Sequence, residues 1–137
     1  MPEQTHTIAR AGGLATLALL LVALALAGCG VGRAGDREKI SKTTTTYLRA
    51  LAAGDTAKAC AQLTRRARGE RCETTTKQRL SRLEPAGLKN AADGSLDIDV
   101  HGKTATAGLS EPKGARFVLK KVGGEWLIDS GYTVGSA

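Results

Sequence analysis

The stretch "ARFVLKKVGGEWLIDSGYTV", residues 115–134, decides the fold because it alternates apolar and polar residues on both sides of a glycine pair. Alternation at period two is typical of a β-strand with one buried face. Gly123 and Gly124 tolerate the positive φ that a two-residue hairpin turn requires at both positions. The preceding stretches "SLDIDVHG" (95–102) and "KTATAGLS" (103–110) alternate in the same way. We therefore predict four antiparallel strands, joined as a meander, in the second half of the chain.

The first of these strands carries the residues that come nearest to a catalytic set. Its apolar and polar faces are Leu96, Ile98 and Val100 against Asp97, Asp99 and His101. A histidine beside two carboxylates could abstract a proton, and the same trio is the best candidate for holding a metal ion. The apolar face belongs in the core, which turns the polar trio toward solvent. We therefore predict no catalytic residue and no metal site.

Apolar residues recur at helical spacing in the stretch before the strands. We predict three helices, over residues 36–53, 56–66 and 70–83. Gly54 ends the first helix, and Pro85 ends the third. The residues expected on their buried faces are Ile40, Thr44, Tyr47, Leu48, Leu51, Ala57, Cys60, Ala61, Leu63, Cys72, Thr76, Leu80 and Leu83. The predicted fold is therefore α+β, with three N-terminal helices packed on a curved four-stranded antiparallel sheet and preceded by a signal-peptide helix.

The first 28 residues are typical of an export signal rather than of a folded domain. A weakly basic start ends in Arg10, and the following run "AGGLATLALLLVALALAG" (11–28) carries no charge. Eighteen apolar residues can just span a bilayer, so a retained membrane anchor is one alternative. Ala25 to Ala27 fit the A-x-A pattern of ordinary secretion, so a cleaved secretory signal is another.

A third alternative, a lipoprotein signal, fits best. The residues Leu26, Ala27 and Gly28, followed by Cys29, resemble the lipobox of bacterial lipoproteins. The resemblance implies a diacylglyceryl thioether on Cys29, cleavage before it, and possible N-acylation of the freed amine. Several acyl chains hold a protein firmly, because one chain contributes only about 0.8 kcal/mol per buried CH₂. We therefore predict a lipid-anchored protein on the extracytoplasmic face of the cell membrane, with no cofactor besides this lipid.

The other two cysteines form an even pair once Cys29 is assigned to lipid. Cys60 and Cys72 lie twelve positions apart, and an exported protein meets an oxidising compartment. A disulfide across this loop would stabilise the fold by about 3 kcal/mol. Two buried free thiols are the alternative. A redox-active pair is disfavoured because the spacing is not C-x-x-C.

Three glycines after the lipobox spell a nucleotide-binding motif. Gly30, Gly32 and Gly35 read G-x-G-x-x-G, and Asp55 follows 20 residues after the last of them. A dinucleotide site requires a β-strand before the glycines, whereas here the apolar signal precedes them. We therefore predict that residues 29–35 form a lipidated flexible tether.

Two stretches of the mature chain resemble a known family. "YLRALAAGDTAKACAQLT" (47–64) resembles the opening of small bacterial lipoproteins, of actinobacterial type, with the nuclear transport factor 2-like or cystatin-like cone fold. "VGGEWLIDSG" (122–131) resembles the last two strands of that fold. The resemblance implies three helices wrapped on a curved sheet, often with a cavity between them. Relatives include isomerases and dehydratases, but no catalytic motif of theirs matches residues of this chain.

The charge balance indicates a basic surface. The formal net charge is +7, and four arginines are concentrated in one short run: Arg65, Arg66, Arg68 and Arg71. Such a run could contact anionic lipid headgroups or an anionic wall polymer, while a solvated face is the alternative. Nucleic acid is not an expected partner, because no aromatic platform accompanies the arginines.

The sequence thus predicts a signal (1–28), a tether (29–35) and one α+β domain (36–137). We expect the domain to be a non-catalytic module that binds an unidentified ligand or an envelope protein. An enzyme of the same cone fold is one alternative. A sensory or assembly partner of another envelope protein is the other.

Overall fold

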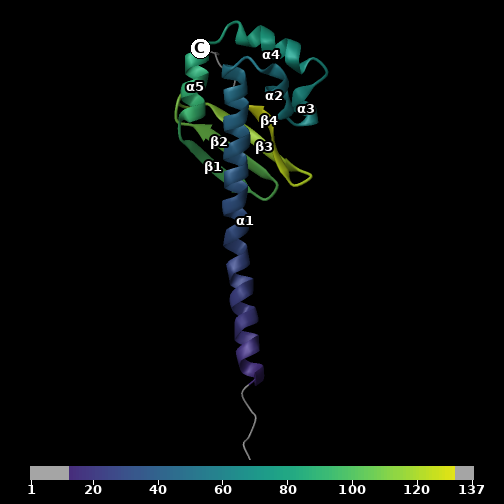
Figure 1. Ribbon diagram of the computed structural model, residues 1–137, viewed down its shortest axis with the longest axis vertical. Helices are drawn as coiled ribbons and strands as arrows, with labels where there is room; N and C mark the ends of the chain where they lie inside the picture. The colour runs from purple at the N-terminus through teal and green to yellow at the C-terminus, as the bar shows by residue number, and fades with distance from the viewer. Residues whose placement is uncertain (1–12, 132–137) are drawn as a thin grey trace, which may run out of the picture. The chain divides into compact units, whose positions relative to one another are not determined.

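The computed structural model describes the backbone of residues 13–131 and the side chains of residues 32–131 (Figure 1). The chain divides into two compact units, Met1–Arg33 and Ala34–Ala137, and the fold discussed below is that of the second. The helices are α1 (Gly13–Ala52), α2 (Thr56–Ala61), α3 (Arg65–Arg68), α4 (Cys72–Leu80) and α5 (Pro85–Asp93). The strands are β1 (Leu96–His101), β2 (Thr104–Leu109), β3 (Arg116–Val122) and β4 (Glu125–Gly131).

The predicted meander is confirmed. The strands pair in the order β1-β2-β3-β4, each pair antiparallel, in a sheet that does not close on itself. The turn between β3 and β4 is the predicted glycine pair, with φ of 59° at Gly123 and 86° at Gly124. Positive φ at both positions matches the twist of the flanking strands, so Val122 pairs directly with Glu125. The fold class is therefore α+β, as predicted.

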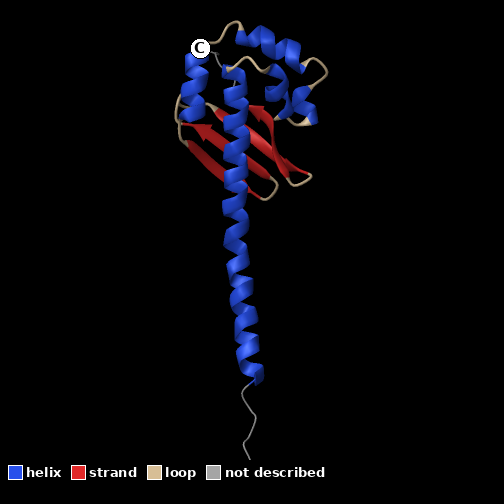
Figure 2. Ribbon diagram, in the orientation of Figure 1, coloured by secondary structure: helices blue, strands red, loops and turns tan. Residues whose placement is uncertain are grey.

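Helix α1 crosses one face of the sheet, and α2, α3 and α4 gather near the C-terminal end of α1 (Figure 2). The hydrophobic core lies between α1 and the sheet. Its largest fully buried side chains include Trp126, Phe117, Ile40 and Leu48. The ring of Tyr47 meets Phe117 edge-on, with centroids 5.7 Å apart. The predicted buried face of the first helix is thus confirmed, because Ile40 and Leu48 are fully enclosed.

The prediction of three helices is wrong, because the described part of the chain contains five. The predicted helix 56–66 divides into α2 and α3, since the backbone between them leaves the helix to pair with β4. The Thr64 N–H donates to the Ile128 carbonyl over 2.8 Å, and the Ile128 N–H donates to the Gln62 carbonyl over 2.9 Å. As a result Ala57 and Ala61, expected in the core, are exposed.

Helix α5 was not predicted at all. Pro85, read as the end of a helix, instead begins one. Proline is favourable in the first turn of a helix, because its missing N–H has no partner there in any case. The helix buries an apolar face made of Leu88, Ala91 and Ala92. The predicted third helix correspondingly shortens to the nine residues of α4.

The predicted tether 29–35 is also helical, because it belongs to α1. Each glycine in a helix costs about 1 kcal/mol relative to alanine, but unlike proline it keeps the backbone hydrogen bond. The side chains of the predicted lipobox, Leu26 to Cys29, lie outside the described residues, so lipid attachment stays a prediction. Residues 1–12 of the predicted signal and residues 132–134 of the predicted last strand lie outside the described backbone.

Candidate functional site

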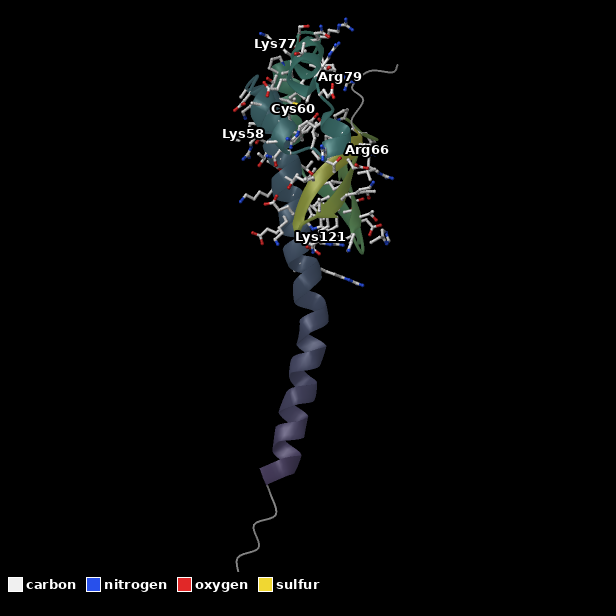
Figure 3. The ribbon with its side chains drawn as sticks, turned by 90° about the vertical axis from the view of Figure 1, so that its right-hand side faces the viewer. Lys58, Cys60, Arg66, Lys77, Arg79 and Lys121 are labelled. Carbon is white, nitrogen blue, oxygen red and sulfur yellow. A yellow bond between two sulfur atoms is a disulfide. The ribbon has the colours of Figure 1, made fainter. Side chains whose placement is uncertain are left out.

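The positive charge of the chain is concentrated in residues 56–83, which comprise α2, α3, α4 and their connections. This segment holds eight Lys and Arg against two Glu, a net charge of +6, compared with +7 for the whole chain. Figure 3 shows Lys77 and Arg79 at one end of the domain, with Cys60 between them and Lys58. We call residues 56–83 the basic cap.

A groove of about 520 Å³ opens between α1, α3 and α4, within the basic cap and beside Tyr47. Its lining combines guanidinium groups, threonine hydroxyls and a few apolar side chains. The lining residues are Tyr47, Leu63, Ala67, Arg68, Gly69, Glu70, Arg71, Cys72, Thr75, Thr76 and Arg79. A concave surface of this size suits a small ligand or one segment of a longer one.

Three arginines dominate the charge of this groove. Within residues 32–131, Arg68, Arg71 and Arg79 form no ion pair with an acidic side chain. Glu70 is the one acidic residue of the lining. The guanidinium groups are donors only and stay charged at any physiological pH, so the groove attracts anions.

Arg66, which the sequence also offered for anion contact, is engaged by a buried carboxylate. Its Nη2 lies 2.5 Å from Oδ2 of Asp129, whose side chain is only 5 % exposed. Lys120 Nζ lies 2.9 Å from the same oxygen, and the Thr64 hydroxyl donates to Oδ1 over 2.8 Å. These donors hold the pKa of Asp129 well below its usual range, and the hydrogen bond from Arg66 has the largest effect. Arg66 therefore joins α3 to β4.

The structure places the four arginines of the predicted basic run in different surroundings. Arg68 and Arg71 line the groove, Arg66 is bound by Asp129, and Arg65 is exposed on α3 outside the groove. Arg79 was not among the predicted contact residues, although a signal for it exists in the sequence. Arg71, Thr75 and Arg79 recur every four residues, so the N-cap residue Arg71 lies in line with Thr75 and Arg79 of α4.

Helix α4 forms one wall of the groove, and a disulfide between Cys60 and Cys72 attaches this helix to α2. It joins α2 to the first residue of α4, with Cα atoms 6.1 Å apart, as the predicted pairing requires. No residue of α4 is fully buried. Leu80 of α4 packs against the hydrophobic core while only partly buried, so the covalent link adds to a shallow packing contact. Thr76 Oγ1 lies 3.8 Å from each of the two sulfur atoms.

Tyr47 connects the groove to the hydrophobic core. The ring packs against Phe117, while the residue also lines the groove. Burial raises the pKa of Tyr47, and the positive charge of Arg79 opposes that rise. The tyrosine is therefore a neutral hydroxyl at physiological pH, and it can donate or accept one hydrogen bond.

The polar trio on β1 lies away from the groove. His101 Nε2 lies 2.8 Å from Asp99 Oδ2, but the two side chains are 75 % and 65 % exposed. Asp97 is exposed as well. Over the residues whose side chains the structure describes, no group of His, Cys, Asp and Glu is arranged to hold a metal ion.

Asp36 anchors the start of the domain. It accepts from Lys121 Nζ over 2.8 Å and from the Trp126 indole N–H over 2.9 Å. These two donors lower the pKa of Asp36, and the hydrogen bond from Lys121 has the larger effect. Lys121 lies at the end of the sheet away from Lys77 and Arg79 (Figure 3). The groove is therefore at the end of the domain remote from this anchor.

Comparison with protein-family models, with curated proteins and with solved structures found no match. In the described part of the chain, no helix combines the length and the apolar character that crossing a membrane requires.

Proposed function

We propose that this protein is an exported lipoprotein, held on the extracytoplasmic face of the cell membrane through Cys29, whose domain binds a ligand without converting it. The observation that carries the binding function is the open groove of the basic cap, lined by three guanidinium groups that form no ion pair within residues 32–131. Binding sites of this kind combine an apolar floor with a few polar groups that orient the ligand. Leu63 and Tyr47 supply apolar surface, and the arginines supply the polar groups.

The same geometry favours binding over catalysis. The charged groups of the groove are three arginines and one glutamate, with no histidine among its lining residues. The residues best suited to general acid–base chemistry, His101 and Asp99, lie on β1 and are largely exposed. We also propose that the domain is a distant variant of the nuclear transport factor 2-like cone, because helices precede a four-stranded antiparallel meander in its chain.

The lipobox supports the proposed location, and its cysteine provides the test. We expect wild-type protein expressed in a bacterial host to take up an alkyne-labelled palmitate and to fractionate with membranes. The variant Cys29→Ser should lose the label entirely, because no thiol remains to accept the diacylglyceryl group. The double variant Cys60→Ser/Cys72→Ser is the matched control and should keep the label. A wild type without label, or a Cys29→Ser variant that retains it, would refute the lipid anchor.

A further inference from the structure

We infer that the groove of the basic cap binds a ligand that carries two or more phosphate groups, with Arg68, Arg71 and Arg79 as the binding residues. This inference rests on the proposed function, since it takes the groove as a place for binding. It goes further by naming the chemical class of the ligand and by adding Arg79 to the site.

The spacing of the arginines suits a ligand with more than one anionic group. Arg71, the N-cap residue of α4, and Arg79, within the helix, are eight residues apart, which places their backbones about 12 Å apart along the helix axis. Arg68 lies on α3 and lines the same groove. A chain of linked phosphates can meet each of the three guanidinium groups in turn, whereas a single phosphate would have to be shared by all three.

The donors of the groove fit phosphate chemistry. A guanidinium group forms paired, parallel hydrogen bonds with two phosphate oxygens, and such charge-assisted bonds are about twice as strong as neutral ones. The hydroxyls of Thr75 and Thr76 line the same groove and add donors between the arginines. The volume of about 520 Å³ leaves room for several linked phosphate groups.

A solvated surface alone does not account for this arrangement. Residues 56–83 hold +6 of the net charge, which leaves +1 for the remainder of the chain. Charges of one sign gathered around a concave surface repel each other and destabilise the folded state, while they raise the local concentration of anions. Among the basic residues of the cap that lie outside the groove lining, Lys58, Lys77 and Arg82 supply a control for the effect of net charge alone.

The test titrates the full chain, in neutral detergent micelles, with sodium tripolyphosphate and separately with orthophosphate. We expect tripolyphosphate to bind at least tenfold more tightly than orthophosphate. The variant Arg68→Gln/Arg71→Gln/Arg79→Gln should bind tripolyphosphate at least tenfold more weakly than the wild type. The charge-matched variant Lys58→Gln/Lys77→Gln/Arg82→Gln should lose less than threefold. If the groove variant fails to fold, the single variant Arg79→Gln should still weaken binding at least threefold.

Equal losses in the two triple variants would overturn the inference, because they would show a general field without a site. Failure of the wild type to bind tripolyphosphate in the millimolar range would overturn it as well. Both outcomes are independent of acylation at Cys29, so they leave the proposed lipid anchor intact.

A second arm identifies the source of the phosphate. The full chain is placed in phosphatidylcholine vesicles with and without phosphatidylglycerol, and tripolyphosphate binding is measured again. Weaker binding in the anionic vesicles means that lipid headgroups occupy the groove. Unchanged binding means that the ligand is a soluble or wall-borne polyphosphate compound. Either result supports the phosphate chemistry, provided that the groove variant removes the binding.

Discussion

Arg66 of α3 and Asp129 of β4 form an ion pair between an exposed and a buried side chain. The Asp129 side chain is 5 % exposed, whereas the Arg66 side chain is 70 % exposed. The pair depends on a β-bulge. Leu119 pairs with Ile128, and Val118 pairs with Ser130, so Asp129 is the extra residue on β4. A bulge redirects the side chain of its extra residue, and here that side chain meets α3. The basic cap is thereby joined to the sheet beside the groove.

This pair predicts a loss of stability in acid. Because Arg66, Lys120 and Thr64 lower the pKa of Asp129, the folded state holds the ionised form more strongly than the unfolded state does. The resulting stability is fully present above the ordinary carboxyl pKa of about 4 and decreases as the pH falls below it. We expect the midpoint of thermal unfolding of Asp129→Asn to lie below that of the wild type at pH 7. The difference should narrow between pH 4 and pH 2, as measured by circular dichroism. A difference that is independent of pH would contradict the assignment.

Thr44 predicts a stabilising substitution. It is fully buried on α1, and its hydroxyl has no hydrogen-bond partner among the described residues. Such a group carries a desolvation cost that valine, of nearly the same shape, does not have. Thr44→Val should therefore raise the free energy of unfolding by about 1 kcal/mol, as measured by urea denaturation.

The neighbouring Thr43 is the matched control for this substitution. Its hydroxyl donates to the Trp126 carbonyl over 2.9 Å. Thr43→Val should consequently lower the free energy of unfolding by about 1 kcal/mol, because the carbonyl loses its donor. If both substitutions changed stability in the same direction, the interpretation of Thr44 as an unpaired hydroxyl would be wrong.

The strand pattern could be predicted from the sequence because it depends on neighbouring residues. Alternation and the pair Gly123 and Gly124 specify the hairpin locally, and the register follows from them. The bulge could not be predicted, since regular alternation would place Asp129 on the exposed face of the sheet. Its burial depends on Arg66, which is 63 residues distant in the chain.

The helices were harder to predict for the same reason. The break between α2 and α3 exists because Thr64 and Gln62 bond with Ile128 on β4, a contact that no local pattern indicates. The site was partly predictable: Arg68 and Arg71 belong to an evident basic run, whereas the place of Arg79 beside them depends on the register of α4. The disulfide pairing followed from counting cysteines, but its position at the groove did not.

Gly131 predicts a severe defect from a small substitution. Its φ is 119°, and an added Cβ would lie 2.6 Å from the Phe117 Cα atom and would overlap the Arg116 carbonyl oxygen. Gly131→Ala should lower the free energy of unfolding by about 2 kcal/mol or more, through backbone strain and this clash. Gly87→Ala is the control, because α5 leaves open space at that position. It should instead raise stability by about 0.5–1 kcal/mol. Urea denaturation of the two variants gives the comparison.

The disulfide predicts that reduction affects α4 before the rest of the domain. Cys60 and Cys72 close a short loop, and loss of such a link costs about 3 kcal/mol. Because no residue of α4 is fully buried, this helix should open locally while the sheet and its core remain folded. Trypsin should therefore cleave the reduced protein at Lys77 and Arg79 at least tenfold faster than the oxidised protein, as followed by mass spectrometry.

Lys89 on α5 provides the internal control for this experiment. It is exposed, its Nζ lies 2.8 Å from Asp93, and α5 is held by its own buried apolar face instead of the disulfide. Cleavage at Lys89 should change less than twofold on reduction, and the variant Cys60→Ala/Cys72→Ala should behave as the reduced wild type does. Since α4 also carries Arg79, the reduced protein should lose tripolyphosphate binding together with the protection of α4. Equal protection of α4 in the two redox states would mean that packing alone holds the helix, and the disulfide would then have no part in maintaining the groove.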